Sequence, residues 1–302
     1  MKKRLHYVFY IPVFFFIILL LSFSQAPDNK GIVIRDEAGR TVVIPVEPES
    51  VVSLSPSNTE ILFAIGAGDM VVGVTEYCNY PPSASGITKV GGFSDVTIER
   101  IVALDPDIIF ASHLHISKVA PALENLGFPV VVINPTTVSA VFTSITFVGQ
   151  ILKKESRADS LAADLRSRYN EITQLVGKKE SVSVYWELSH DFWTIGKSSY
   201  LDDLITRAGG ENIAKDLDAP WLQLSSEFIL DANPGMIFLA DYSQGVTSDE
   251  LFSRPGWDAL SAMKRNRVIE VEPDINDIVS RPGPRVIVAL EYIAGLLHPE
   301  LF

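Results

Sequence analysis

Seven short apolar runs typical of β-strands recur along the chain, and one long interval without such a run divides them into two groups. The runs cover residues 51–54, 71–75, 108–110, 130–133, 182–186, 236–239 and 268–271. Helix-length segments separate most of them, and this alternation predicts an α/β fold with parallel sheets. A chain of 302 residues is long enough for one large domain or for two lobes with a sizeable core.

The interval from about Val138 to Val176 shows only helical periodicity, with a break expected near residues 153–156. Its second part has the apolar stripe of an amphipathic helix, formed by Leu161, Leu165, Tyr169, Ile172 and Leu175 or Val176. Because no Gly-, Ser- or Pro-rich linker occurs at this junction, we expect two α/β lobes joined by one long helix. The predicted boundaries are 27–154 for the N-terminal lobe, 155–178 for the joining helix and 179–302 for the C-terminal lobe.

The first 26 residues have the pattern of an export signal. Residues 2–4 are basic, residues 8–21 form an apolar run, and residues 24–26 (Ser-Gln-Ala) place small side chains at the −3 and −1 positions of a cleavage site. We predict export with cleavage after Ala26, to the periplasm or the cell surface. An uncleaved membrane anchor is the alternative, although the run is a little shorter than the roughly 20 residues of a spanning helix. No cysteine directly follows the apolar run, so a lipid-attachment site is not expected.

The charge of the chain excludes one class of partner. The formal net charge of −12 becomes −15 without the first 26 residues, because three basic and no acidic side chains leave with them, so that 25 − 3 = 22 basic side chains oppose 37 acidic ones. Nucleic-acid binding depends on neutralisation of phosphates by Lys and Arg, so no nucleic-acid partner is expected. Cys78 is the only cysteine and cannot form an intramolecular disulfide; we interpret it as a small, half-buried residue.

An internal repeat relates the two groups of strands at a constant offset of 128 residues. Residues 99–110 align with residues 227–238, and five positions are identical: Glu99/Glu227, Ile101/Ile229, Pro106/Pro234, Ile109/Ile237 and Phe110/Phe238. The apolar and proline matches fit a helix–turn–strand unit. Each glutamate falls in the first turn of a predicted helix, where the helix dipole favours a carboxylate, so that a structural role is an alternative to a functional one. Ser225 or Ser226 is expected to cap the second helix.

Two histidines follow the strand that ends at Phe110, at the edge where a parallel sheet places ligands. His113 and His115 are candidates for binding a metal, or for an axial ligand to a metal in a macrocycle. Further ligands are not evident, although three residues after a strand of the other lobe could converge on the site: Glu187, His190 and Asp191. A structural or solvent-facing role for both histidines is the alternative.

Aromatic side chains gather in the predicted connections after strands rather than in strand centres. They are Tyr77, Tyr80, Phe93, Phe192, Trp193, Tyr200, Trp221 and Tyr242. Loops that present rings from both lobes would form a flat-walled cleft for a large, partly apolar ligand, and packing at the edge of the core is the alternative for each ring. The sequence contains no P-loop, no G-x-S-x-G elbow and no Cys-x-x-Cys pair, so no enzymatic reaction is indicated.

Several ordered motifs give the chain a resemblance to a known family. They are SLSPSNTE at 53–60, VGVTEYCNYPP at 72–82, IERIVALDPD at 98–107, GGENI at 209–213 and Pro220-Trp221. Over roughly residues 31–300 the chain resembles the substrate-binding proteins of ABC importers for cobalamin and iron-siderophores, the class III periplasmic binding proteins. Residues 77–82 and Pro220-Trp221 look most like the cobalamin-binding branch.

The resemblance implies two Rossmann-like lobes with parallel sheets, bridged by one long rigid helix, and a ligand bound between the lobes. The positions that match the family's ligand contacts are Tyr77, Phe93 and Trp221, and we add Trp193 and Tyr200 from the aromatic loops. Phe93 replaces a tryptophan of the enterobacterial cobalamin protein, and Ser112 stands where that protein has another ring, so the detailed corrinoid contacts differ.

The family's two surface carboxylates, one in each lobe, match Glu99 and Glu227, and the resemblance implies that they pair with arginines of a membrane permease. We therefore expect a non-enzymatic, monomeric carrier without a cofactor. It would bind cobalamin or a related corrinoid, a cobalt-containing macrocycle, and deliver it to permease subunits that work with a cytoplasmic ATPase.

Two other ligands of the same family and one other class of protein are alternatives. An anionic ferric siderophore would need a cluster of cations; the loops before residue 250 offer Lys89 and Lys197, and the last loop offers Arg281 and Arg285. Haem would need an axial ligand such as His113 or His115. The alternative class is a secreted metal-dependent enzyme that uses these histidines and an acid.

Overall fold

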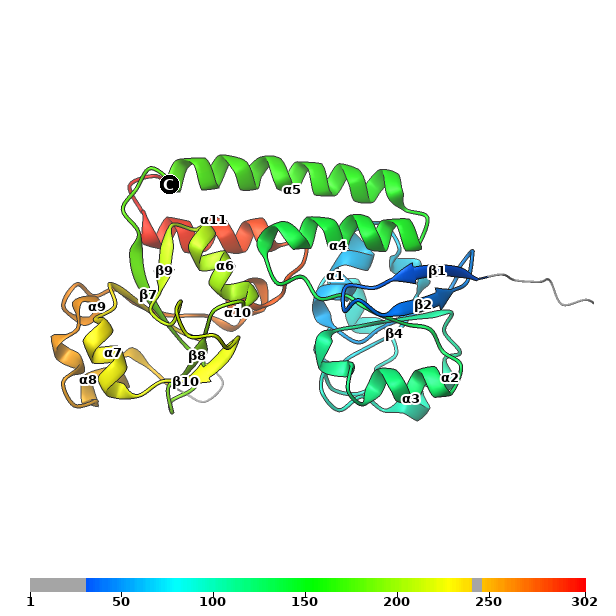
Figure 1. The fold of residues 1–302 in the computed structure, drawn as a ribbon, viewed down its shortest axis with the longest axis horizontal. Coiled ribbons are helices and arrows are strands. Elements are labelled where there is room, and N and C mark those ends of the chain that lie inside the picture. The colour runs from blue at the N-terminus through cyan, green and yellow to red at the C-terminus, as the bar shows by residue number, and fades with distance from the viewer. Residues whose placement is uncertain (1–30, 241–245) are drawn as a thin grey trace, which may run out of the picture. The chain divides into compact units, whose positions relative to one another are not determined.

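The computed structural model describes residues 31–240 and 246–302 (Figure 1). The predicted export signal at residues 1–26 and the candidate ring of Tyr242 lie outside these residues. Within the described ranges no helix is both long enough and apolar enough to cross a membrane.

The N-terminal lobe is built on a four-stranded parallel sheet in the order β4-β3-β5-β6. Its strands are β3 (Val51–Ser53), β4 (Val71–Val74), β5 (Ile108–Ala111) and β6 (Val130–Val132). All four agree with the first group of predicted runs. Every residue of β3, β5 and β6 is buried, as expected for a parallel sheet that is covered on both faces. The helices of this lobe are α1 (Pro56–Ala64), α2 (Ile98–Ala103) and α3 (Val119–Asn125).

A short antiparallel hairpin, which the sequence analysis did not predict, precedes this sheet. It consists of β1 (Ile32–Arg35) and β2 (Thr41–Ile44). The carboxylate of Asp36 accepts hydrogen bonds from the Arg40 guanidinium at 2.8 Å and from the Val132 backbone N–H at 3.1 Å. The bond from Val132 attaches the hairpin turn to the end of β6, and the bond from Arg40 closes the turn itself.

The C-terminal lobe contains a mixed sheet in which a parallel centre carries two antiparallel strands. The parallel strands are β7 (Val182–Glu187), β9 (Gly210–Asn212), β11 (Met236–Leu239) and β12 (Val268–Glu270). Strands β8 (Trp193–Ile195) and β10 (Trp221–Gln223) pair antiparallel at one edge. The three predicted runs are confirmed as β7, β11 and β12. The helices of this lobe are α6 (Tyr200–Arg207), α7 (Ser226–Ala232), α8 (Ser248–Ser253), α9 (Ser261–Lys264) and α10 (Pro273–Ser280).

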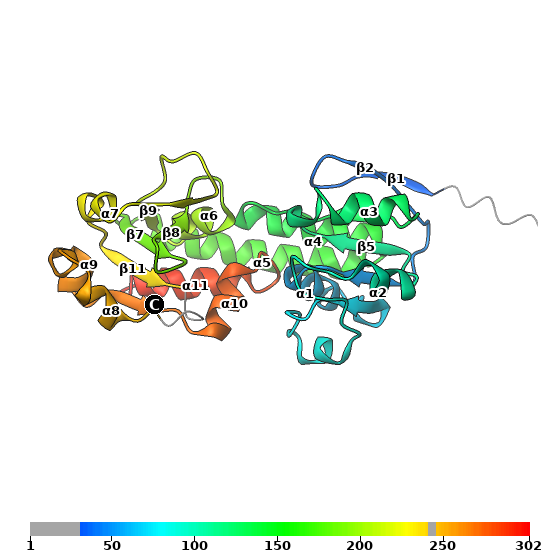
Figure 2. The same ribbon diagram turned by 90° about the horizontal axis from the view of Figure 1, so that it is seen from below.

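The interval without strand signals forms two helices, α4 (Val138–Ile151) and α5 (Glu155–Val176), with the chain break where it was predicted. Helix α5 lies along α4 and also along α11 (Val286–Leu297) (Figure 1, Figure 2). One long helix therefore packs against elements of both lobes.

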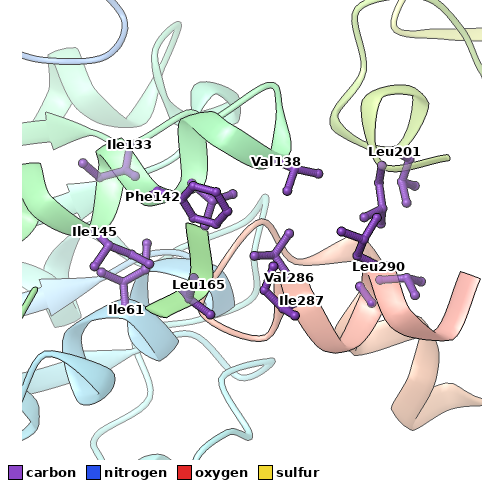
Figure 3. Packing of buried hydrophobic residues seen from close by; sticks show 14 of the residues in the cluster. Ile61, Ile133, Val138, Phe142, Ile145, Leu165, Leu201, Val286, Ile287 and Leu290 are labelled. Atoms are coloured by element: carbon purple, nitrogen blue, oxygen red, sulfur yellow. The ribbon is translucent and has the colours of Figure 1, made fainter. Parts of the chain in front are cut away.

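A continuous apolar core runs through this helical layer. Figure 3 shows side chains of α4, α5 and α11 together, with Phe142, Leu165 and Leu290 among them. All three are buried, and burial of a Leu or Phe side chain stabilises a fold by roughly 1.5–3 kcal/mol. A large hinge motion would separate these contacts, so the packing favours small relative movements of the lobes. The exact boundaries drawn from the sequence stay a prediction.

Candidate functional site

The loops after the parallel strands of the N-terminal lobe contact the segment after β12 of the C-terminal lobe. Glu60 lies in α1, which follows β3, and Asn79 lies in the loop after β4. Asn79 donates to the Asp277 carboxylate of α10 at 2.8 Å and accepts from Arg281, at the end of α10, at 2.7 Å. Ligands of α/β sheets bind outside the carboxyl ends of strands, so this meeting point is the candidate ligand site.

Five polar residues form the contact, and we call them the interlobe charge cluster: Glu60, Asn79, Asp277, Arg281 and Arg285. The Glu60 carboxylate, whose side chain is 1% exposed, accepts from Arg285 at 2.5 and 2.8 Å and from Arg281 at 3.3 Å. Arg281 also pairs with Asp277 at 2.7 Å. Two guanidiniums thus face two carboxylates, and the formal charges of the cluster cancel.

The two tyrosines of the loop after β4 lie against this cluster. Tyr77, a predicted ligand contact, is 60% exposed, and its backbone carbonyl accepts from Arg281 at 3.3 Å. The Arg285 guanidinium lies 4.2 Å from the centre of the exposed Tyr80 ring, within the range of a cation–π contact. The cluster therefore holds the backbone of the loop and leaves the Tyr77 ring accessible to a ligand.

His115 has a structural arrangement that does not suit the axial-ligand hypothesis. Its Nδ1 accepts from the Ser112 backbone N–H at 3.0 Å, so the proton is on Nε2, which donates to the Phe93 carbonyl at 2.8 Å. Burial lowers the pKa of His115, which keeps the ring neutral. Both ring nitrogens are thus occupied by the protein, whereas the neighbouring His113 is exposed on the same short turn, η3 (His113–His115).

Phe93, another predicted contact, is half-buried and is oriented by His115. The two rings meet edge to face, with centres 5.6 Å apart and planes at 84°. Together with the hydrogen bond to its carbonyl, this packing fixes the Phe93 backbone and ring against the short turn η3, which follows β5.

Trp193 and Trp221 lie within strands, and the expectation that they lie in connections was wrong. They are the first residues of β8 and β10, and in the ladder Trp193 pairs with Gln223 while Trp221 pairs with Ile195. This register places the two residues diagonally on one face of the ladder, where the backbone positions of diagonal partners lie roughly 7–8 Å apart. They are 42% and 47% exposed, so the C-terminal lobe presents two neighbouring indoles that the sequence separates.

Tyr200 differs from the other candidate rings because its hydroxyl is buried. The residue begins α6, after a helix cap in which Ser199 accepts from the Asp202 N–H at 3.1 Å. Among the described residues its hydroxyl has no hydrogen-bond partner. Burial, and then the carboxylates of Asp203 and Glu60, raise the pKa of Tyr200, which keeps its hydroxyl protonated and able to donate.

The two repeated glutamates lie in the first turns of α2 and α7 and are exposed, as expected. Ser225 caps α7 by accepting from the Phe228 N–H at 3.2 Å. Hydrogen bonds from the Glu227 N–H and from Ser225 lower the pKa of Glu227, so this carboxylate is ionised at neutral pH. Glu99 and Glu227 thus present negative charge at corresponding positions of the two lobes.

Several cations that could serve a ligand are bound within the protein, whereas Lys197, between β8 and α6, is exposed. Lys89 donates to the Cys78 carbonyl at 3.2 Å. Arg254 forms two 2.7 Å hydrogen bonds with the fully buried Glu187 carboxylate, so Glu187 points into the lobe. Sequence reasoning identified Arg281 and Arg285 as cations of the last loop but missed their partner Glu60, because no local pattern relates positions more than 200 residues apart. Across residues 31–240 and 246–302 no group of three or more His, Cys, Asp or Glu side chains could hold a metal ion.

Two α/β lobes with a shared helical layer, and with exposed rings and a neutral charge cluster at the strand ends, define a two-lobed binding protein. Residues 51–275 match the periplasmic binding protein family, and the chain belongs to that family. The resemblance stated from the motifs and the predicted fold class are therefore confirmed.

Curated relatives are named as binding proteins, and one of them as a component of an ABC transporter. The chain is 34% identical to an uncharacterised ABC transporter substrate-binding lipoprotein, YvrC, of Bacillus subtilis, over 92% of this chain and 89% of the relative. It is 26% identical to the vitamin B12-binding protein of Vibrio campbellii, over 80% and 86% of the two chains. This chain is thus an ABC transporter substrate-binding protein, a class that works with permease and ATPase subunits, and the family implies an extracytoplasmic location.

Solved structures of the same fold belong to proteins that are named for different ligands. The vitamin B12-binding protein BtuF of Vibrio cholerae superposes with a TM-score of 0.74 at 27% identity, covering 83% of this chain and 97% of that one. The haem-binding protein RhuT of Roseiflexus superposes with a TM-score of 0.74 at 25% identity, covering 84% and 99%. The fold alone therefore does not identify the ligand, which depends on the residues of the site.

Proposed function

We propose that this substrate-binding protein binds cobalamin or a related corrinoid between its two lobes and delivers it to an ABC permease. The observation that carries the proposal is the combination of exposed rings on both lobes with a cluster whose charges cancel. Tyr77 belongs to one lobe, and Trp193 and Trp221 belong to the other. Such a surface suits a large ligand that combines an apolar ring edge with uncharged amides, as a corrinoid does.

The same observation argues against an anionic ferric siderophore. A strongly anionic ligand would need guanidinium or ammonium groups to pair with. Arg281 and Arg285, the main candidates from the sequence, are already paired with Glu60 and Asp277. A siderophore would have to displace a buried carboxylate, which costs the desolvation of that carboxylate as well as the lost pairing.

The relatives also support a corrinoid. Beside the Vibrio protein, the chain is 28% identical to a cobalamin-binding protein of Halobacterium salinarum over 87% of this chain. Haem is the second candidate, because the exposed His113 stands at the end of β5 and a haem-binding relative has the same fold. Of the two histidines only His113 offers a ring nitrogen for an axial bond without loss of the hydrogen bonds that hold Phe93.

The proposal is tested by calorimetric titration of the purified protein with cyanocobalamin, haemin, a ferric catecholate siderophore and zinc. We expect heat with the corrinoid and none with the siderophore or with zinc. Tight siderophore binding without corrinoid binding would overturn the ligand and leave the transport class intact. Haemin binding that His113→Ala abolishes would favour haem, and a zinc-dependent hydrolytic activity would favour the enzyme alternative.

Two tryptophan variants and one control variant test where the ligand binds. Trp193→Ala and Trp221→Ala should each weaken corrinoid binding by roughly 3- to 10-fold, because one aromatic contact contributes about 0.5–1.5 kcal/mol beyond its area. Phe252→Ala removes an equally exposed ring of α8, outside the proposed site, and should leave the affinity unchanged. Equal effects of all three variants would contradict the proposed surface.

Docking to the permease is proposed for Glu99 and Glu227. Both carboxylates are exposed, and Glu227 is kept ionised by its hydrogen bonds. Arginines on two permease arms would form charge-assisted contacts with them.

A further inference from the structure

The loop that carries Tyr77 and Tyr80 is held from two sides. Within its own lobe, the buried Cys78 thiol lies 3.1 Å from the hydroxyls of Thr59 and Thr75. From the other lobe, Arg281 donates to the Tyr77 carbonyl and to the Asn79 side chain. Charged donors therefore hold the loop from both sides, since Lys89 of the same lobe donates to the Cys78 carbonyl at 3.2 Å and Arg281 donates from the other lobe. Hydrogen bonds with a charged partner contribute more than neutral ones.

Glu60 is the centre of the outer anchor. It lies one residue after Thr59 in α1, and its buried carboxylate is the shared acceptor for both guanidiniums. Arg281 and Arg285 have side chains that are largely buried themselves, so each depends on a paired carboxylate. Without the charge of Glu60, Arg281 would keep only the half-exposed carboxylate of Asp277, and Arg285 would lose the carboxylate with which it pairs.

We propose that Glu60 is a positioning residue for ligand binding, which fixes Arg281 and Arg285 against the loop from Tyr77 to Tyr80 and so determines how its rings are presented to the ligand. Glu60 does not itself touch the ligand in this proposal. The inference rests on the proposed function for the ligand, but the anchoring of the loop can be measured without any ligand.

The geometry of Arg285 shows why loss of the Glu60 carboxylate would also affect the Tyr80 ring. Its guanidinium is held by two hydrogen bonds to Glu60, and the same planar group lies 4.2 Å from the centre of the Tyr80 ring. A guanidinium that is fixed on its edge by a carboxylate presents a flat face for stacking. Loss of the carboxylate would therefore release the stacking partner of Tyr80 together with the backbone anchor at Tyr77.

The first test is hydrogen–deuterium exchange of the ligand-free protein. In Glu60→Gln the amides of residues 76–80 should exchange roughly 10-fold faster, because the charge-assisted bonds that hold the loop are weakened. Glu76→Gln changes an exposed carboxylate of the same loop and should leave the exchange unaltered. Unchanged exchange of residues 76–80 in a folded Glu60→Gln protein would overturn the proposal.

A second variant provides the same test if Glu60→Gln does not fold. Asn79→Ala removes one of the two links between Arg281 and the loop without unpairing a buried charge, and Asn79 is exposed, so the protein should fold. We expect faster exchange of the same amides in this variant. Exchange at the wild-type rate would contradict the anchoring role of Arg281.

The second test measures affinity for cyanocobalamin in a double-mutant cycle. Glu60→Gln should weaken binding roughly 10-fold in the wild-type background and much less when Tyr77 and Tyr80 are both replaced by Ala, because the rings it positions are then absent. Full additivity of the two changes would show that Glu60 only stabilises the fold, and would overturn the proposal. If the wild type binds no corrinoid, the proposed ligand fails, while the exchange result still decides whether Glu60 anchors the loop.

Discussion

Asp105 and Asn233 occupy corresponding positions of the two lobes, and both have a left-handed backbone, with φ angles of 46° and 44°. They are separated by the repeat offset of 128 residues, and each is followed by a proline. Two residues further on, the N–H groups of Asp107 and Gly235 donate to the carbonyls of Ser50 and Ser183 at 3.0 and 2.9 Å. The repeat is therefore a structural unit, in which helix, left-handed turn and strand recur.

The left-handed turn predicts the response of Asp105 to substitution. Asp and Asn tolerate positive φ better than other residues with a side chain, and Gly tolerates it best. Asp105→Ala should reduce the free energy of unfolding by about 1 kcal/mol, whereas Asp105→Gly should leave it nearly unchanged. Urea denaturation measures both, with the exposed helical Asp231→Ala as the control. Equal stabilities of the Ala and Gly variants would contradict the argument.

The repeat was visible in the sequence because its turn and strand residues recur at a constant offset, and the seven short runs were visible because most of their residues are apolar. Strands β8 and β10 were missed because each has only three residues, one of them polar, so that neither shows a continuous apolar run or a recognisable alternation. Their pairing, and thus the proximity of Trp193 and Trp221, depends on the tertiary fold. The same holds for Glu60 and Arg285, which meet across 225 residues.

The docking proposal predicts a separation of binding from transport. The double variant Glu99→Ala with Glu227→Ala should keep its corrinoid affinity, because neither carboxylate belongs to the proposed ring surface or to the interlobe charge cluster. It should lower corrinoid uptake by at least about 10-fold. Uptake of labelled cyanocobalamin by cells and calorimetry of the purified variant provide the two measurements.

A control variant with the same change of charge tests whether the position of the two glutamates determines the effect on uptake. Asp159→Ala with Asp164→Ala removes two exposed carboxylates from α5 and should leave uptake at the wild-type level. Normal transport by the Glu99 and Glu227 double variant would mean that these residues only favour the starts of their helices.

His115 predicts a loss of stability in mild acid. Burial lowers the pKa of His115 below its ordinary value of 6.5. Below about pH 6.5 the unfolded chain therefore binds a proton that the folded protein resists, and stability falls as the pH decreases through the pKa of the folded state. Protonation would also place a proton on Nδ1 against the Ser112 N–H, which now donates to that atom.

Urea denaturation at about pH 7.5 and about pH 5 measures this effect. We expect His115→Gln to be less stable than the wild type at the higher pH and to lose less stability on acidification. The exposed His113→Gln should behave like the wild type. An unchanged pH dependence in His115→Gln would assign the acid sensitivity to other groups.

The surroundings of Arg254 predict that the two carboxylates which share its guanidinium contribute very differently to the free energy of unfolding. Glu187 is fully buried and accepts two 2.7 Å bonds from Arg254, while Glu250, with a side chain 41% exposed, accepts one at 3.2 Å. Arg254 also lies 4.6 Å from the Trp257 ring centre and 5.0 Å from that of Phe192, the neighbour of Trp193. The guanidinium thus links the core of the lobe to the start of β8.

Glu187→Gln should reduce the free energy of unfolding by about 3–5 kcal/mol, because it leaves a buried guanidinium with only the half-exposed Glu250 carboxylate as its counter-charge. Glu250→Gln should cost less than about 1 kcal/mol, as expected for an exposed partner. Urea denaturation of the two variants compares the same chemical change on the same arginine. If Glu187→Gln still folds, its corrinoid affinity should also fall, since Arg254 would no longer hold the ring of Phe192 beside Trp193. Similar losses of stability in both variants would show that burial does not decide the strength of this pair.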